Sequence, residues 1–241
     1  LEQSAKEAKL LLFCSPHNPV GRVWQQSELK RLLQIAHQYD LIILSDEIHA
    51  DLIFPENKHT VLATIAEHSA KIITAMTPSK TFNIPGLNLS SLIIPDKQIR
   101  TAINKIFNTM HVSASNPFSI VAFEAAYRYG EEWLEDLLIY LRDTRDQVTA
   151  FLTNQLPQIK LAMTEGTYLL WLDCHALKMD DAQLKYFMVH EAGVGLSPGV
   201  LFGEEGSGFM RLNIGAPRHT IMQILKNIKQ AYERISKSSR T

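Results

Sequence analysis

Short apolar runs alternate with helical patterns along the first hundred residues of this chain. Four runs are candidate strands, at 10–13, 41–44, 71–75 and 88–94. Between the first two runs, the apolar residues of 27–39 recur at the spacing of one helix face, and Ser27 is the expected helix cap. This alternation is typical of an α/β fold, in which crossover helices connect the strands of a sheet.

The pattern changes after Pro95. Asp96 is the expected cap of a helix with an apolar stripe, and a helical stretch with an expected break near Gly130 follows from 117 to 154. Shorter elements fill the rest of the chain, with strands expected at 159–163, 169–173 and 209–214 and helices at 180–191 and 218–236. We predict a larger α/β domain over residues 1–115, a long connecting helix over 116–154 and a smaller α+β domain over 155–241.

Charge and apolar patterning exclude several classes of partner. Lys and Arg number 24 against 25 Asp and Glu, so no net charge favours nucleic acid or an anionic membrane. No apolar run reaches the roughly 20 residues that a membrane span needs. The two cysteines form no disulfide framework, and we therefore expect a cytoplasmic protein. Because the chain opens on Leu1-Glu2 rather than on Met, we also expect that it begins inside a longer protein.

Polar clusters follow three of the candidate strands, at 15–19, 45–49 and 77–80. Loops are polar in general, so one such cluster would carry no functional meaning. In open α/β sheets, however, ligands bind beyond the carboxyl ends of the strands. Three clusters with complementary chemistry therefore predict that these segments converge on one crevice.

Lys80 lies among hydroxyl residues in the third cluster, close to Thr77 and Ser79. A lysine taken alone is more often a solvated surface residue. A lysine that is kept from bulk water can instead react through its amine with an aldehyde. The neighbouring hydroxyls suit an aldehyde cofactor that also carries a phosphate.

Asp46 follows an apolar strand and is expected to be partly buried, so it needs a cationic partner. A protonated pyridine nitrogen is one such partner, and His49 could hydrogen-bond a phenolic oxygen on the same ring. Asp46, Glu47 and His49 could alternatively bind a metal ion, but no spacing typical of a metal site supports this. We expect no metal.

Two further residues fit the same ligand. The amide of Asn18 could donate to the ring oxygen, although Asn-Pro with a nearby glycine is also an ordinary turn. Arg211 interrupts an apolar strand, so it is either paired inside the protein or available to bind a carboxylate through two hydrogen bonds.

These residues, in this order, resemble the fold-type I pyridoxal-phosphate (PLP) enzymes of the class I/II aminotransferase superfamily. The resemblance covers essentially the whole chain and rests on the Asn-Pro-x-Gly, Asp-Glu-Ile, Ser-Lys and Arg-Leu-Asn motifs. Within the superfamily the chain is most similar to the MalY/PatB-like cystathionine β-lyase (C–S lyase) branch. The segments that indicate this branch are Ser45–His49, Ser79–Leu87 and Glu165–Asp173. The implied fold is part of the PLP-transferase large domain, a mixed and mostly parallel sheet with helices on both faces, plus a smaller α+β domain.

The resemblance implies a role for each candidate residue. Lys80 would bind the cofactor aldehyde and act in catalysis, Asp46 would pair with the pyridine nitrogen, and Arg211 would bind the substrate carboxylate. Asn18 and His49 would approach the ring oxygen, and Thr77 and Ser79 would face the phosphate. Where many aminotransferases have an arginine eight residues after the lysine, this chain has Asn88, and the usual glycine-containing phosphate loop is absent from its sequence. Phosphate binding would therefore depend more on hydroxyls.

The implied activity is elimination from a sulfur-containing amino acid, which gives pyruvate, ammonia and a thiol, in an enzyme that is a homodimer. The same residues would serve a PLP-dependent aminotransferase, so that alternative stays open. A third possibility is that the chain is catalytically silent because it lacks part of the site. A metal hydrolase that uses Asp46, Glu47 and His49 is a distant fourth.

Overall fold

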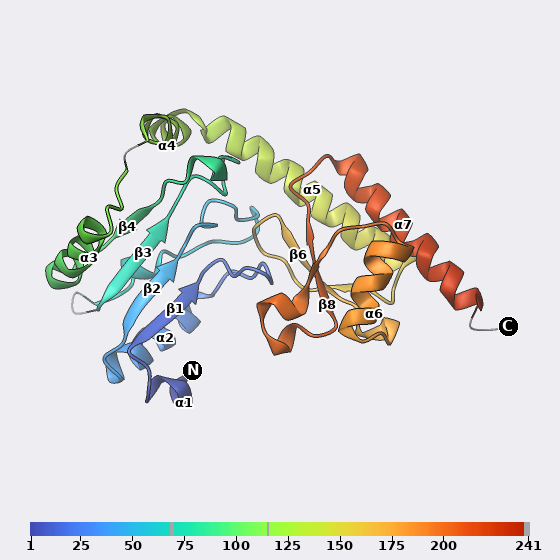
Figure 1. Cartoon of the computed structure of the whole chain (residues 1–241), viewed down its shortest axis with the longest axis horizontal. Coiled ribbons are helices and arrows are strands. Elements are labelled where there is room, and N and C mark those ends of the chain that lie inside the picture. Colours follow the sequence, from blue (N-terminus) through green and yellow to red (C-terminus); the bar gives the residue numbers. More distant parts are fainter. Residues whose placement is uncertain (68–69, 115, 239–241) are drawn as a thin grey trace. The chain divides into compact units, whose positions relative to one another are not determined.

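The computed structural model describes residues 1–67, 70–114 and 116–238 (Figure 1). Contacts divide the chain into two units: Leu1–His17 with Val23–Asp136, and Asn18–Arg22 with Leu137–Thr241. The change from the first unit to the second falls inside helix α5 (Glu131–Gln155). The three domains expected from the sequence, with boundaries at 115 and 154, stay a prediction.

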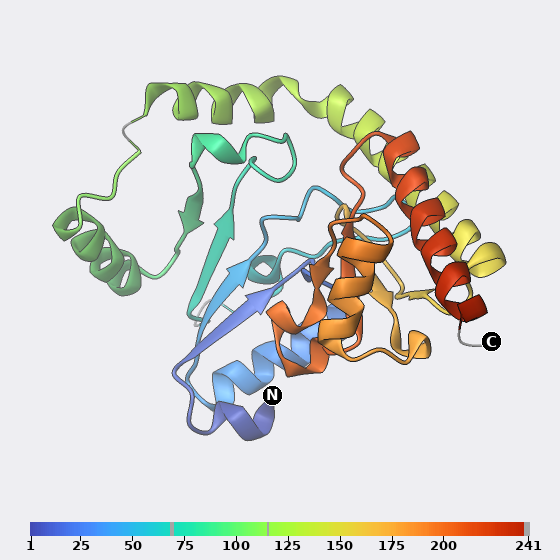
Figure 2. The same ribbon diagram turned by 45° about the vertical axis from the view of Figure 1, so that its right-hand side comes forward.

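The first unit is built on a four-stranded sheet in the order β1-β2-β3-β4 (Figures 1 and 2). The strands are β1 (Leu10–Cys14), β2 (Ile42–Asp46), β3 (Ile72–Met76) and β4 (Ser91–Ile93). β1, β2 and β3 run parallel, and β4 is antiparallel to β3. The predicted mixed, mostly parallel α/β sheet is thus confirmed.

Helix α2 (Gln26–Gln38) packs on this sheet through the apolar face that the sequence predicts. Leu29, Leu32 and Ile35 are buried in one cluster with Phe13 and Ile43 of the strands. Each such side chain contributes roughly 1.5–3 kcal/mol when it is removed from water. The expected cap at Ser27 is wrong: the helix begins after Gln25, whose N–H donates to the Glu28 carboxylate at 2.9 Å. That bond defines the start of the helix, so Ser27 lies within its first turn.

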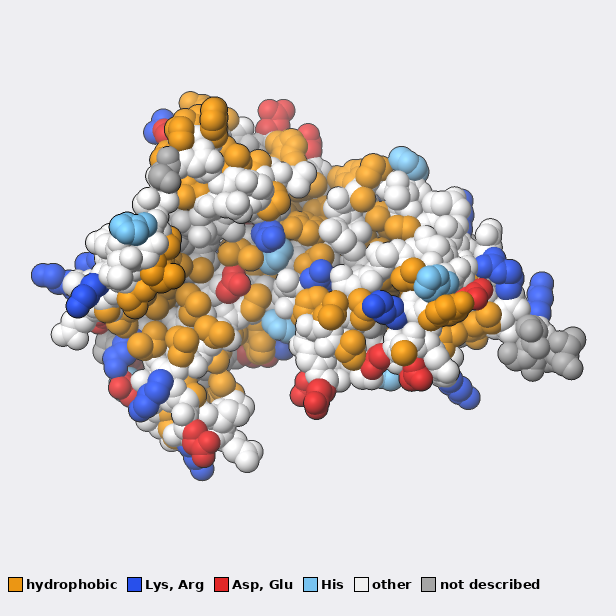
Figure 3. Space-filling view, viewed as in Figure 1, with side chains coloured by type: hydrophobic (Ala, Val, Ile, Leu, Met, Phe, Trp, Pro, Cys, Tyr) orange, Lys and Arg blue, Asp and Glu red, His pale blue; other side chains and the backbone are white. Residues whose placement is uncertain are grey.

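Helices α3 (Lys97–Thr109) and α4 (Pro117–Tyr129) follow the sheet. Asp96 caps α3 as predicted, because its carboxylate accepts the N–H of Ile99 at 2.8 Å. The predicted break at Gly130 is also confirmed, since α4 ends there and α5 begins. Many large apolar side chains of this unit are exposed, among them Leu12, Ile93, Ile106, Met110, Phe118 and Val121. In the space-filling view, hydrophobic side chains gather over the strands and helices of this unit (Figure 3).

The second unit holds an antiparallel sheet in the order β5-β6-β8-β7. Its strands are β5 (Lys160–Leu161), β6 (Leu169–Asp173), β7 (Ser197–Pro198) and β8 (Phe209–Asn213). Helices α6 (Asp181–Tyr186) and α7 (Arg218–Ser238) accompany the sheet, and Leu170, Leu212 and Leu225 are fully buried. The predicted helix at 180–191 is shorter than expected, because a π-helical turn (Phe187–Glu191) follows α6. The remaining elements are the short helix α1 (Glu2–Ala5) and 3₁₀ turns at Leu62–Thr64, Pro85–Leu87, His175–Leu177, Gly199–Phe202 and Glu204–Gly206.

No helix in the described part of the chain is both long and apolar enough to cross a membrane.

Candidate active site

Asp46 lies at the carboxyl end of the central strand β2, at the end of the sheet where the parallel strands finish. Asp46 is the last residue of this strand and lies opposite Cys14 of β1 and Ala75 of β3. Backbone bonds continue the pairing, from Ser15 N–H to the Asp46 carbonyl at 3.0 Å and from Glu47 N–H to the Ala75 carbonyl at 2.9 Å. Because β2 and β3 are parallel, the segment that follows β3, with Lys80, leaves the sheet at the same edge as Asp46.

The Asp46 side chain is half-buried and sparsely bonded. One carboxylate oxygen accepts the N–H of Ile48 at 3.2 Å. Among the described residues no other side chain bonds or pairs with this carboxylate. A partly buried carboxylate without a cationic partner is costly, so its arrangement favours a positively charged ligand.

Glu47, which sequence reasoning assigned only to the unlikely metal site, has a structural role. Its carboxylate is 3% exposed and accepts bonds from the Ser45 hydroxyl at 2.9 Å and the Leu62 N–H at 3.2 Å. The Nε2 atom of His59 lies 2.7 Å from its other oxygen. Residues 1–67, 70–114 and 116–238 contain no group of three or more His, Cys, Asp and Glu side chains that could hold a metal ion. Glu47 therefore fixes the loop from 47 to 62, which also contains the buried His49.

The lysine segment forms a tight turn directly after β3. The Thr77 hydroxyl accepts the N–H of Ser79 at 3.1 Å, lies 2.8 Å from the Ser79 hydroxyl and donates to the Leu89 carbonyl at 2.7 Å. Lys80 is half-buried, and its amine has no hydrogen-bond or ion-pair partner in the described part of the chain. The turn thus holds the lysine backbone and leaves the amine free to react.

The side chains that follow Lys80 anchor this turn, a role that the sequence analysis did not assign to them. The fully buried Thr81 donates to Asp51 at 2.9 Å, and the Phe82 ring packs against Tyr127 and Trp133 with centroids 5.8 Å apart. Burial, together with the charge of Asp51, raises the pKa of Tyr127 to about 12. Ser119 adds a short hydrogen bond to the Leu87 carbonyl. No local pattern around Phe82 could have indicated this anchor, because its aromatic partners Tyr127 and Trp133 lie far along the chain.

Asn18 and Arg211 meet in the second unit. Arg211 Nη1 donates to the Asn18 side-chain oxygen at 2.9 Å, and Nη2 donates to the Ser197 hydroxyl at 3.3 Å. These partners are neutral, and no described carboxylate pairs with Arg211. Burial lowers the pKa of Arg211 from its ordinary value, and the nearby Tyr168 opposes that shift. The guanidinium nevertheless stays charged at neutral pH and suits a carboxylate ligand.

Asn18 belongs to a segment that is fixed to the second unit by its backbone. The Gly21 carbonyl accepts the N–H groups of Glu165 at 2.8 Å and Gly166 at 3.1 Å. Gly21 has φ +78°, and a side chain there would meet Thr164 at 2.7 Å. The glycine of the Asn-Pro-x-Gly turn is therefore required by backbone conformation and by space.

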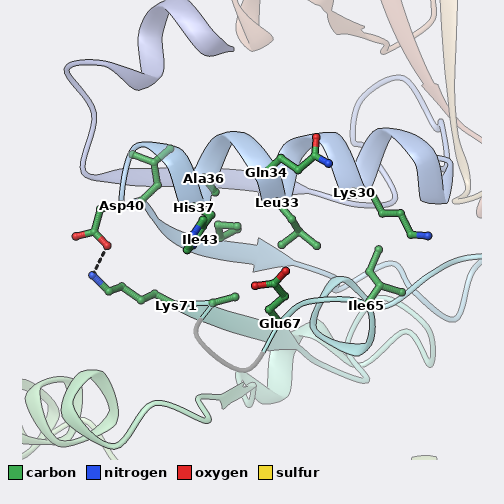
Figure 4. A pocket seen from close by; sticks show the side chains of 12 residues that line it. Lys30, Leu33, Gln34, Ala36, His37, Asp40, Ile43, Ile65, Glu67 and Lys71 are labelled. Atoms are coloured by element: carbon green, nitrogen blue, oxygen red, sulfur yellow. Dashed lines mark hydrogen bonds and ion pairs between the residues drawn. The ribbon is translucent and has the colours of Figure 1, made fainter.

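A cleft of the first unit lies away from these residues. It has a volume of about 300 Å³ and opens between α2 and a wall that includes Ile65, Glu67 and Lys71 (Figure 4). The ion pair between Lys71 and Asp40, at 2.7 Å, lies at one end. Leu41 and Lys71, which line the cleft, precede β2 and β3, so it lies toward the opposite ends of these strands from Asp46. No residue of the predicted site lines this cleft.

The chain is similar in sequence and in structure to known proteins. Cystathionine beta-lyase PatB from Bacillus subtilis (strain 168) is 39% identical over 223 residues, which are 92% of this chain and 58% of PatB. Protein MalY from Escherichia coli (strain K12) is 34% identical over 213 residues, 88% of this chain and 54% of MalY. The crystal structure of cystalysin from Treponema denticola, which contains PLP, is similar with a TM-score of 0.94 at 39% identity, over 97% of this chain and 60% of cystalysin.

The chain thus spans a little more than half the length of the relatives that it matches. The family model for aminotransferases of class I and II matches residues 1–228. This match covers the sheet with Asp46, the Lys80 turn and the strand with Arg211, and the chain belongs to the aminotransferase class I and II family.

Proposed function

We propose that this chain carries the lysine and carboxylate groups of a PLP-dependent C–S β-lyase. The observation that supports this most is that Asp46 and Lys80 follow two adjacent parallel strands at the same end of the sheet. Within the described residues, the Asp46 carboxylate has no cationic partner and the Lys80 amine has no hydrogen-bond or ion-pair partner. The names of PatB and of a 34% identical Corynebacterium glutamicum protein, both cystathionine beta-lyases, favour a lyase over an aminotransferase.

The residues present fit PLP. When bound, PLP supplies an aldehyde that condenses with amines and a ring that withdraws electrons from the substrate α-carbon. The uncommitted Lys80 amine suits the aldehyde, and the unpaired Asp46 carboxylate suits a protonated ring nitrogen. Ser79 and Thr77 would offer hydroxyls to the phosphate, and Asn18 and His49 would donate to the ring oxygen.

In the proposed reaction Lys80 is the group that moves a proton. The Lys80 amine would act as general base and take the proton from the substrate α-carbon. Asp46 would pair with the protonated ring nitrogen, and Arg211 would hold the substrate carboxylate through two hydrogen bonds. Loss of the α-proton and of the sulfur as a thiolate would leave a product that takes up water and gives pyruvate and ammonia.

An absorbance titration with PLP tests the cofactor assignment. The chain is expected to develop a visible band that Lys80→Ala abolishes. Lys71→Ala is the matched control, because Lys71 lies at the other end of β3 and pairs with Asp40. A band that survives in Lys80→Ala would refute the role of Lys80. Absence of any band in the wild-type chain would favour the third possibility, a catalytically silent chain.

Incubation with cystathionine separates the lyase from the aminotransferase, which is the second candidate. Pyruvate formed without a keto-acid acceptor indicates a lyase. Amino-group transfer that requires such an acceptor indicates an aminotransferase and would overturn the proposal.

We further propose a cytoplasmic homodimer. The exposed apolar side chains of the first unit, such as Met110 and Phe118, support association, and the free thiols Cys14 and Cys174 are compatible with a reducing compartment. Sedimentation velocity checks the dimer: a mass of one chain at all concentrations would contradict it.

A further inference from the structure

The Phe202 ring covers one face of the Arg211 guanidinium. The Arg211 Cζ atom lies 4.7 Å from the ring centroid, within the range of a cation–π contact. Asn18 and Ser197 take hydrogen bonds from Nη1 and Nη2, and Ser197 of β7 lies directly opposite Arg211 in the antiparallel pairing. The guanidinium is therefore held at both terminal nitrogens and along one face.

Phe202 is itself placed by a closed loop. The 3₁₀ turns Gly199–Phe202 and Glu204–Gly206 approach so closely that a side chain on Gly199 would lie 2.1 Å from the Gly206 carbonyl oxygen. Gly203, between them, has φ +126°, which only glycine adopts without strain. Trp171, the cross-strand partner of Arg211, meets the Phe202 ring edge-on at 5.7 Å. Phe202 thus contacts two neighbouring side chains of the sheet, Arg211 and Trp171.

The guanidinium is held in place, but some of its N–H groups have no hydrogen-bond acceptor among the described residues. Arginine has five N–H donors, and Asn18 and Ser197 use two of them. The buried Nε has no partner among the described residues. A buried donor without a partner is unfavourable, so an arriving carboxylate gains from a cation that is fixed in place and still has N–H groups to donate.

We propose that Phe202 and Ser197 are positioning residues that hold Arg211 ready for the substrate carboxylate. This inference rests on the proposed role of Arg211, but its first consequence can be measured without catalysis. The ring and the hydroxyl restrict rotation of the guanidinium, so their loss frees Arg211 and weakens carboxylate binding.

The test uses the 241-residue chain without cofactor and compares wild type, Phe202→Ala, Phe202→Tyr and the control Leu201→Ala. Leu201 is the neighbouring apolar residue and is 72% exposed. The first readout is water exchange of the Arg211 Nε–H, followed by NMR and assigned with Arg211→Lys. The second is the Kd for propionate, a carboxylate without an amine.

Phe202→Ala is expected to speed exchange and to weaken propionate binding about fivefold, which corresponds to about 1 kcal/mol. Phe202→Tyr keeps the ring and is expected to stay within about twofold of wild type, as is Leu201→Ala. If Phe202→Ala does not fold, Ser197→Ala provides the same test, with an expected loss of about threefold.

Unchanged exchange and Kd in Phe202→Ala, or an equal effect of Leu201→Ala, would overturn the inference. Propionate binding that is unaffected by Arg211→Lys would instead refute the carboxylate role of Arg211 within the proposed function. In that case the exchange rates alone still decide whether Phe202 positions the guanidinium.

Discussion

Replacement of Glu47 by alanine tests whether the carboxylate next to Asp46 holds the site loop. Glu47 is almost fully buried and accepts bonds from Ser45, Leu62 and His59. The change leaves two buried donors and one buried imidazole without their acceptor. A buried donor that is left without its acceptor costs about 1–3 kcal/mol, so the loss of the acceptor shared by Ser45, Leu62 and His59 is expected to cost about 3–5 kcal/mol. That is a large share of the roughly 5–15 kcal/mol that stabilises a typical domain.

Glu47→Gln removes the negative charge of the side chain but keeps its size and shape. The amide oxygen can still accept from Ser45 and Leu62, so only the charge-assisted contact to His59 weakens. We expect a loss of about 1 kcal/mol, the difference between a charged and a neutral hydrogen bond. Glu135→Gln, on the exposed side of α5, is the matched control and should be near neutral.

Urea unfolding followed by circular dichroism measures these losses, and hydrogen exchange of peptides from 42 to 62 shows whether they arise in this loop. A double-mutant cycle with His59→Gln should give a coupling energy above about 1 kcal/mol. A loss below about 1 kcal/mol in Glu47→Ala, or unchanged exchange in the loop, would refute the assignment of Glu47 as the residue that fixes it.

Three further outcomes are expected. Gly130→Ala should destabilise the chain by about 1–3 kcal/mol in urea, because the new side chain would lie 2.3 Å from the Phe82 ring, whereas Gly86→Ala, with open space, should not. Burial, together with the charge of Asp173, raises the pKa of Cys174 to about 12. This thiol should therefore react with a disulfide reagent only after unfolding, and rapid labelling of the native chain would contradict this prediction. The folded chain holds the Tyr127 proton more tightly than the unfolded chain, whose tyrosine titrates at 10.0. Stability from Tyr127 should therefore be complete below pH 10 and decline as the pH rises toward about 12, and Tyr127→Phe should remove that part of the alkaline loss.

The parallel strands could be predicted because each is a short apolar run that ends in polar residues. β1, β2 and β3 all lie within a residue or two of their predicted positions. β7, of two residues, carries no apolar signal and was missed, although it places Ser197 opposite Arg211. The start of α2 was misplaced because a preferred capping residue, Ser27, competed in the sequence with a Glu28 that reaches back to Gln25.

The residues of the candidate site also divide into those that the sequence predicts and those that it does not. Residues with distinctive chemistry in a strand-end cluster, such as Lys80 and Asp46, could be proposed from the sequence. Residues that hold the segments around them, such as Glu47 and Asp51, act through contacts with residues 12 and 30 positions away, and no local pattern predicts such contacts. The bonds from Thr81 to Asp51 and from Ser119 to Leu87 join segments about 30 residues apart.

Asp46 and Glu47 provide an internal comparison, because they are neighbouring carboxylates at the end of one strand. Glu47 has acceptor bonds to a hydroxyl, a backbone N–H and an imidazole, as a structural buried carboxylate must. Asp46 is half-buried and has a single bond, to the N–H of Ile48. Successive side chains along a strand point to opposite faces of the sheet, so the partners of Glu47 are not available to Asp46. The incomplete bonding of Asp46 within the described residues therefore favours a ligand as its partner.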